Sequence, residues 1–329
     1  MRYVLALICS MLVAPASAET PSIRSIIDSH VLPGYSALAQ TTAQLADAAA
    51  QDCAPTNAKL LDAYHDAFDA WIGVSHLRFG PSEEDDRAFE LAFWPDPRGS
   101  TPKTLAELIR SEDPVVSNPA DFATVSVAAR GFYALEFLLF DSRFTSDASP
   151  YHCALVQAVS ADIAENSAAI LADWEAGFAD LMAQANNDTY RTQREAAQQL
   201  FTALTTGLEF TANMRVGRPL GTFDRPRPNR AEARRSERSL RNVVLSLTAT
   251  RDLAMRLSDD NAVVAADFDR ALERAEGIDD PIFASVADPA GRFRVEALQN
   301  SVITAYRTLL EDIGPDLGIT AGFNSLDGD

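Results

Sequence analysis

Apolar residues recur at helical spacing along almost the whole chain of 329 residues, and this pattern decides the fold class. No stretch sustains the alternation of apolar and polar residues that a half-buried β-strand shows. Runs of β-branched residues are scarce, whereas alanine, a strong helix former, is abundant. We therefore expect an all-α protein, and the length favours two domains at about 150 residues per domain.

A break at Asn186-Asn187-Asp188 divides the expected helices into two groups of four main helices. The expected helices are 22–50, 57–78, 121–141 and 150–185, then 188–216, 229–256, 261–276 and 288–312. Between 79 and 120 we expect a long connection with short helical pieces at best, because Gly80-Pro81 stops a helix. The sequence thus predicts two four-helix-bundle-like domains packed together, over 19–186 and 187–329.

The first 18 residues are typical of a secretory signal peptide. A short basic start precedes the apolar run Val4–Ala14, and Ala16-Ser17-Ala18 forms a small-residue cleavage site. We expect cleavage after Ala18 and a periplasmic mature protein. No later stretch approaches the roughly 20 apolar residues of a membrane-spanning helix, so we expect no transmembrane segment in the mature chain.

Removal of the signal peptide also removes Cys9 and leaves two cysteines, Cys53 and Cys153. An even pair in an oxidising compartment favours one disulfide between them. The alternative is a pair of thiolate metal ligands, but the close Cys-x-x-Cys spacing of such sites is absent.

The chain is acidic, with 28 Lys and Arg against 47 Asp and Glu and a net charge of −19. Such a charge repels phosphate backbones, so we expect no nucleic-acid partner. The basic residues are uneven, and seven arginines fall between Arg225 and Arg241. Four of them recur at helical spacing and are our candidate ligand-binding residues: Arg230, Arg234, Arg238 and Arg241.

These arginines allow two interpretations. Arginine's planar fork suits bidentate contacts with carboxylate or phosphate, so the face could bind a small anionic ligand. The same residues could instead form ion pairs with the acidic remainder of the protein. In either case we expect them where the two halves meet.

A second candidate region is the segment Arg130–Phe140, where apolar residues fall on every side of the expected helix. Glu136 is then a carboxylate in apolar surroundings and must be paired, bound to a ligand or protonated. Tyr133 lies three residues earlier on the same face. A hydrogen bond or ion pair that satisfies the core and a functional site both remain open.

The histidine side of the helix 57–78 is a third candidate. His65, Asp69 and His76 line up at spacings of four and seven, which could serve a metal or form a solvated boundary face. The sequence contains no His-Glu-x-x-His, Gly-x-Ser-x-Gly, Walker or Gly-x-Gly-x-x-Gly motif, which removes the common signatures of zinc proteases, serine hydrolases and nucleotide-binding folds.

At the segment Gly131–Phe140 the chain resembles the imelysin family of bacterial envelope proteins, which includes iron-regulated protein A. The family hallmark is Gly-x-His-x-x-Glu followed by an apolar run. Gly131, Glu136 and the run Phe137–Phe140 match it, but Tyr133 stands where the histidine belongs. Four other segments are also similar to the family and occur in the family's order along the chain: Trp71–Val74, Leu77–Pro81, Arg227–Asn242 and Gly322–Asp329.

The resemblance implies a two-domain, all-helical periplasmic protein linked to iron uptake, with a metal or ligand site at the motif near the domain interface. Tyr133 and Glu136 are the candidate metal ligands, because phenolate and carboxylate oxygens could hold iron shifted toward Fe³⁺. The alternative is a degenerate site with Tyr133 as a core aromatic.

We expect binding without catalysis, because the hallmark histidine is absent. A metallopeptidase of the imelysin type and an interaction module for an outer-membrane or periplasmic protein are the two alternatives.

Overall fold

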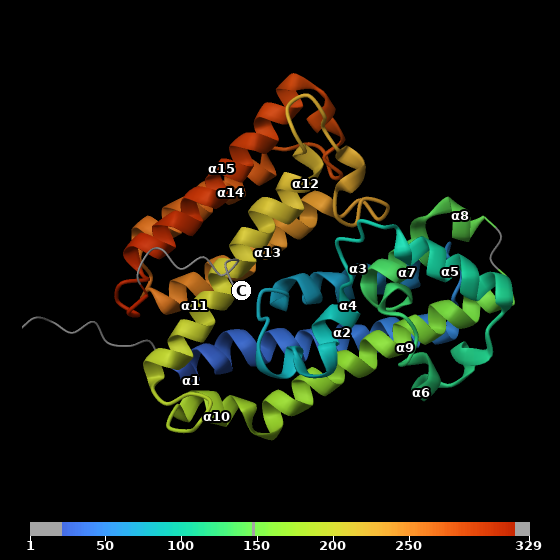
Figure 1. The fold of residues 1–329 in the computed structure, drawn as a ribbon, viewed down its shortest axis with the longest axis horizontal. Coiled ribbons are helices and arrows are strands. Elements are labelled where there is room, and N and C mark those ends of the chain that lie inside the picture. The colour runs from blue at the N-terminus through green and yellow to red at the C-terminus, as the bar shows by residue number, and fades with distance from the viewer. Residues whose placement is uncertain (1–21, 147–148, 320–329) are drawn as a thin grey trace, which may run out of the picture.

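The computed structural model describes residues 22–146 and 149–319 (Figure 1), so the predicted signal peptide lies outside the described residues. The described residues contain no β-strand, only an isolated bridge between Thr222 and Arg225. The prediction of an all-α protein is confirmed. None of the helices in these two segments is long and apolar enough to cross a membrane.

Ten helices precede the predicted break and five follow it in the described residues. The first set is α1 (Ile23–Ile26), α2 (Leu32–Gln51), α3 (Ala58–Val74), α4 (Arg87–Leu91), α5 (Ser100–Ser111), α6 (Pro119–Phe122), α7 (Gly131–Phe140), α8 (Ser142–Thr145), α9 (Pro150–Asp173) and α10 (Ala179–Gln184). The second set is α11 (Gln193–Phe210), α12 (Gly217–Leu220), α13 (Ser239–Leu257), α14 (Ala262–Glu276) and α15 (Pro289–Asp312). Single π-helical turns at 27–31, 174–178 and 211–216 continue α1, α9 and α11.

The helices pack in two groups (Figure 1). In the first group α2 packs against α3 and α9, and α7 packs against α9. In the second group α13 packs against α11 and α14, and α15 packs against α14 and α11. Contacts between α3 and α13 join the groups, and the buried apolar side chains of both form one continuous cluster.

Several predicted helix starts are confirmed because their caps are local in sequence. The side chains of Asn57, Asn261 and Asp288 accept hydrogen bonds from the first backbone amides of α3, α14 and α15. The predicted disulfide is also present. It joins Cys53, just after α2, to Cys153 in α9, with a Cα–Cα distance of 5.3 Å.

Two predictions around the candidate site are wrong at the level of the helix. The expected helix 121–141 is interrupted, and α7 begins only at Gly131, which has a φ of +74°. The expected connection 79–120 contains the twelve-residue helix α5. As a result, α4, α5 and the 3₁₀ turn at 127–129 pack against α7, in space that one long helix 121–141 would occupy.

The third correction concerns the arginine-rich segment. The predicted helix 229–256 begins only at Ser239, after a 3₁₀ turn at Pro228–Arg230 and further turns. Ala233 and Glu237 have φ values of +44° and +58°, which an α-helix cannot contain. Arg230, Arg234 and Arg238 therefore do not share a helical face with Arg241.

Candidate functional site

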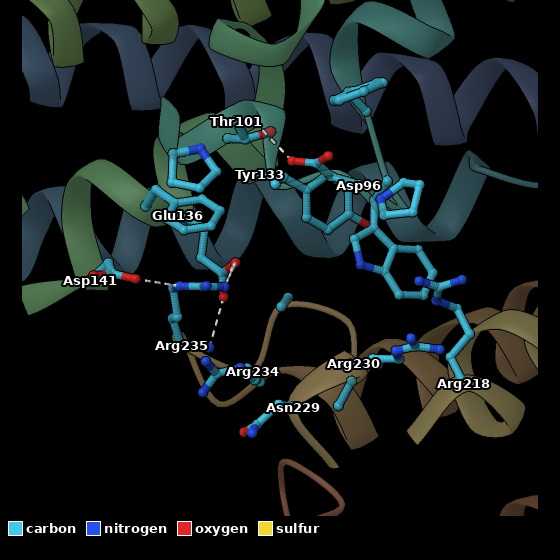
Figure 2. A pocket seen from close by; sticks show the side chains of 18 of the residues that line it. Asp96, Thr101, Tyr133, Glu136, Asp141, Arg218, Asn229, Arg230, Arg234 and Arg235 are labelled. Carbon is cyan, nitrogen blue, oxygen red and sulfur yellow. Dashed lines mark hydrogen bonds and ion pairs between the residues drawn. The ribbon is translucent and has the colours of Figure 1, made fainter. Parts of the chain in front are cut away.

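A pocket of about 660 Å³ lies where the two helix groups meet (Figure 2). One wall comes from the segment between α4 and α5 and from α7, and includes Trp94, Tyr133 and Glu136. The opposite wall is α12 and the turn segment before α13, which bring Arg218 and Arg234 to the pocket. The turn segment 229–238 forms this wall because its left-handed residues prevent it from continuing as a helix.

Glu136 is held by backbone amides of the turn segment. One of its oxygens accepts hydrogen bonds from the amides of Arg235 and Ser236, at 2.9 and 3.0 Å, and from the Ser236 hydroxyl at 3.0 Å. The side chain is only 2% exposed. Burial raises the pKa of Glu136, and the Arg235 charge and these donors oppose the rise.

Tyr133 points to a different carboxylate. Its hydroxyl donates a 2.5 Å hydrogen bond to Glu232, and Arg215 donates to the other oxygen of Glu232 at 3.0 Å. All three side chains are buried. Burial, and then the Glu232 charge, raise the pKa of Tyr133 well above its ordinary value, so the phenol stays protonated.

These contacts do not fit the predicted metal site. Tyr133 and Glu136 each engage a separate partner, so their oxygens do not point to one shared position. In the described part of the chain no three His, Cys, Asp or Glu residues form a group that could hold a metal ion. Arg215 beside Glu232 adds a positive charge where a cation would have to bind.

In the described residues, three guanidinium groups of the pocket have neither an anionic nor a hydrogen-bonding partner. Within residues 22–146 and 149–319, Arg218, Arg230 and Arg234 have no side-chain hydrogen bond or ion pair. The Nε atom of Arg218 is buried without a partner, and its guanidinium lies 5.5 Å from the centre of the Trp94 ring. Burial and the Arg230 charge lower the pKa of Arg218.

At the other side of the turn segment, burial and the Arg235 charge lower the pKa of Arg234, while the charges of Glu136 and Asp141 oppose the fall. An unpaired cation beside other cations is electrostatically unfavourable. Binding of an anion in the pocket would therefore relieve the repulsion between these arginines.

Arg143, Arg235 and Asp141, three of the remaining charged groups of the pocket, pair with one another. Arg235 donates to Asp141 at 2.6 Å and lies 3.7 Å from the centre of the Phe137 ring. Arg143 donates to both oxygens of Asp141 at 2.9 Å. The hydrogen bond from Arg143 is the main cause that lowers the pKa of Asp141, so this corner of the pocket is ionised and balanced.

The four predicted ligand-binding arginines are divided between two environments. Arg230 and Arg234 line the pocket, whereas Arg238 and Arg241 form ion pairs with Asp69 of α3. Arg238 also donates to the ring and the backbone carbonyl of His65, at 3.0 and 3.2 Å. Internal ion pairing thus describes Arg238 and Arg241, whereas the interpretation as an anion-binding group applies to Arg230 and Arg234.

The predicted histidine row does not converge on one point. His65 and Asp69 contact Arg238, just before α13, and Asp69 also contacts Arg241 of α13. The buried His76 instead faces His30, with the two Nε2 atoms 3.1 Å apart. His30 contacts Asp252 of α13 through its other nitrogen at 2.7 Å. Burial lowers the pKa of His76 well below its ordinary value.

Sequence reasoning did not single out Arg215, Arg218 or Trp94, which are central to the arrangement. Trp94 lies in a segment expected to be a connection, and Arg218 precedes Pro219 in a turn-rich region without a periodic pattern. Only the three-dimensional structure brings them together. The contact of Glu232 with Tyr133, 99 residues apart, carries no signal in the sequence.

Comparison with known proteins identifies a family and solved structures with a similar fold. The family model described as Imelysin matches residues 31–309. An imelysin-like protein from Psychrobacter arcticum 273-4 has a similar structure, with a TM-score of 0.75, 19% identity and coverage of 92% of this chain and 96% of that one. A putative iron-regulated protein A precursor from Parabacteroides distasonis ATCC 8503 gives a TM-score of 0.72 at 13% identity, covering 89% and 94%. No curated protein matches the chain in sequence.

Proposed function

The chain belongs to the imelysin family, and from this premise we propose that it is a periplasmic, non-catalytic protein that binds a small anionic ligand as part of iron uptake. The observation that carries the proposal is the set of three unpartnered arginines in one pocket of a chain whose net charge is −19. Because the rest of the chain is acidic, this local excess of positive charge distinguishes the pocket from the remaining surface.

The periplasmic part of the proposal is supported by the signal-peptide pattern of the first 18 residues and by the Cys53–Cys153 disulfide, which suits an oxidising compartment. The link to iron is supported by family membership and by the fold shared with a putative iron-regulated protein A precursor. Because Tyr133 and Glu136 each engage a separate partner, we place the role in iron uptake in the ligand or in a partner protein.

Isothermal titration of the mature protein with organic anions at low ionic strength tests this proposal. We expect saturable binding, weakened about tenfold in Arg230→Gln and in Arg234→Gln, because each substitution removes a charge-assisted hydrogen bond. Arg294→Gln is the matched control, since Arg294 is exposed on α15 and does not line the pocket. Binding that is unaffected by both pocket substitutions would contradict the proposal.

The non-catalytic part has its own test. A metallopeptidase needs about three protein ligands and a metal-bound water. We expect no cleavage of unfolded protein substrates that is sensitive to a chelator. Chelator-sensitive cleavage that is abolished in Glu136→Gln would establish the peptidase alternative in place of our proposal.

A further inference from the structure

The charges that line the pocket set the charge of its ligand. Five arginines and three carboxylates line it, which leaves an excess of two positive charges. Two of the carboxylates are already engaged by charged groups or amides of the chain, Asp141 by Arg235 and Arg143, and Glu136 by the turn segment. The third, Asp96, accepts from the Thr101 amide through Oδ2, and its Oδ1 is buried without a hydrogen-bond partner. A ligand with one negative charge would leave part of this excess uncompensated.

The unpartnered arginines lie at separate places along the pocket. Figure 2 shows Arg218 and Arg230 side by side, whereas Arg234 lies further along the wall toward Arg235. The guanidinium of Arg218 lies over the Trp94 ring. The Arg230 charge acts on the pKa of Arg218, and the Arg235 charge acts on the pKa of Arg234, which agrees with two separate pairs of neighbours. A ligand that satisfies both places needs at least two anionic groups separated by a skeleton.

The backbone amides that commonly bind phosphate are occupied in this pocket. Phosphate favours clusters of backbone N–H groups at helix starts and in turns. At the start of α5 the amide of Thr101 donates to Asp96 at 2.8 Å (Figure 2), and these amides lower the pKa of Asp96 although burial alone raises it. The amides of Arg235 and Ser236 are taken by Glu136. The free donors are guanidinium groups, whose planar forks match carboxylates as well as phosphates, so the pocket lacks the additional amide donors that would favour phosphate.

The size and walls of the pocket agree with an organic skeleton. About 660 Å³ falls within the range of small-molecule sites, and an inorganic phosphate ion would fill only a fraction of it. Phe93, Trp94 and Phe137 give the pocket apolar walls beside the cationic groups. We propose that the ligand is a small polycarboxylate, held by Arg218 and Arg230 at one end and by Arg234 at the other.

This inference rests on the proposed anion-binding function and narrows it to one ligand class. The experiment is isothermal titration of the full mature chain, in metal-free buffer, with citrate, succinate, acetate, inorganic phosphate and pyrophosphate. We expect citrate to bind at least about tenfold more tightly than acetate or phosphate, because it engages both ends.

The outcomes separate the two proposals. Tighter binding of pyrophosphate than of citrate overturns the polycarboxylate class and leaves the anion pocket standing. Equal affinities for acetate and citrate overturn the two-ended arrangement in the same way. No binding of any of these anions would overturn the proposed function as well.

Substitutions locate the two ends. Arg230→Gln, at an exposed position, and Arg218→Gln should each weaken citrate binding about tenfold. Arg234→Gln should weaken citrate by a similar factor and leave acetate binding, centred on Arg218 and Arg230, unchanged. Equal losses for acetate and citrate in Arg234→Gln would contradict the assignment of Arg234 to the second end. Arg294→Gln and the melting temperature of each variant serve as controls for folding.

Discussion

Gly131 is the residue whose identity the structure explains most directly. It starts α7 with a φ of +74°, and a Cβ atom there would lie 2.2 Å from the carbonyl oxygen of Glu90 and 2.4 Å from that of Leu91. Both contacts are with backbone, which cannot swing aside. The glycine therefore allows the end of α4 to approach α7 closely. The segment between α4 and α5, which follows directly, then forms one wall of the pocket.

The first prediction follows from this close approach. Gly131→Ala should lower the free energy of unfolding by about 2–5 kcal/mol, from the left-handed backbone and the overpacking together. Gly73→Ala in α3 is the control, since a Cβ there meets nothing within 4 Å, and it should be neutral or stabilise by up to about 1 kcal/mol. Urea denaturation measures both, and equal effects of the two substitutions would contradict the explanation.

The hydrogen bond from Tyr133 to Glu232 gives the second prediction. Tyr133→Phe leaves a buried carboxylate oxygen without its donor, which should cost about 1–3 kcal/mol of unfolding free energy. Tyr306→Phe, at a partly exposed tyrosine of α15, should change stability by less than about 0.5 kcal/mol. A Tyr133→Phe variant as stable as the wild type would show that this hydrogen bond does not stabilise the fold.

The third prediction concerns pH. His76 is 4% exposed, and its pKa in the folded state lies well below the ordinary value, mainly because of burial and then because of His30 and Arg215. The unfolded chain therefore takes up a proton below about pH 6.5 that the folded chain refuses. Stability should fall as the pH decreases from 7.5 to 5.5, and His76→Gln should reduce this dependence by up to about 1.4 kcal/mol per pH unit.

The measurement is the free energy of unfolding in urea at several pH values. Burial also lowers the pKa of His65 and of His152, so the variant should keep part of the pH dependence. An identical slope for the wild type and His76→Gln would contradict the prediction.

At the scale of the element, the sequence was informative where the determinants of a helix are local. Asn57, Asn261 and Asp288 were correctly placed at helix starts, because a capping side chain bonds to amides two or three residues away. The disulfide was predictable from the count of cysteines alone. The start of α13 was wrong because Glu136, about 100 residues away in sequence, accepts from the amides of Arg235 and Ser236.

The same limit applies to the candidate site. Arg230 and Arg234 were identified from composition and spacing, but the helical face that was expected to align all four arginines does not exist. Arg218 and Trp94 become neighbours only through the packing of the two helix groups. The sequence thus identified some of the charged residues of the pocket, but it did not predict which residues they contact.

The turn segment before α13 allows a fourth prediction. Glu237 is exposed with a φ of +58°, and no side-chain contact of it is found in the described residues. Glu237→Gly should stabilise the protein by about 0.5 kcal/mol, because glycine adopts this conformation without strain. The same substitution at Glu273, exposed within α14, should destabilise by about 1 kcal/mol. Thermal melts of both variants test the opposite signs.

At the scale of the whole molecule, the core does not divide as the helices do. Buried residues of both helix groups belong to one cluster, and the ion pairs of Arg238 and Arg241 with Asp69 join the start of α13 and the residue before it to α3. A continuous core favours cooperative unfolding. We predict a single transition in scanning calorimetry, whereas two resolved transitions would show that the helix groups are independent domains.

The disulfide has a mechanical consequence for this arrangement. Cys53 and Cys153 are 100 residues apart in sequence, and the loop that they close contains Trp94, Tyr133 and Glu136. If the oxidised chain is pulled from its two ends, the loop bears no tension, and roughly 330–360 Å of its contour stays hidden. The wall of Arg218, Arg230 and Arg234 lies outside the loop and takes the full load. Stretching would thus unravel one side of the pocket and leave the other shielded behind a covalent bond.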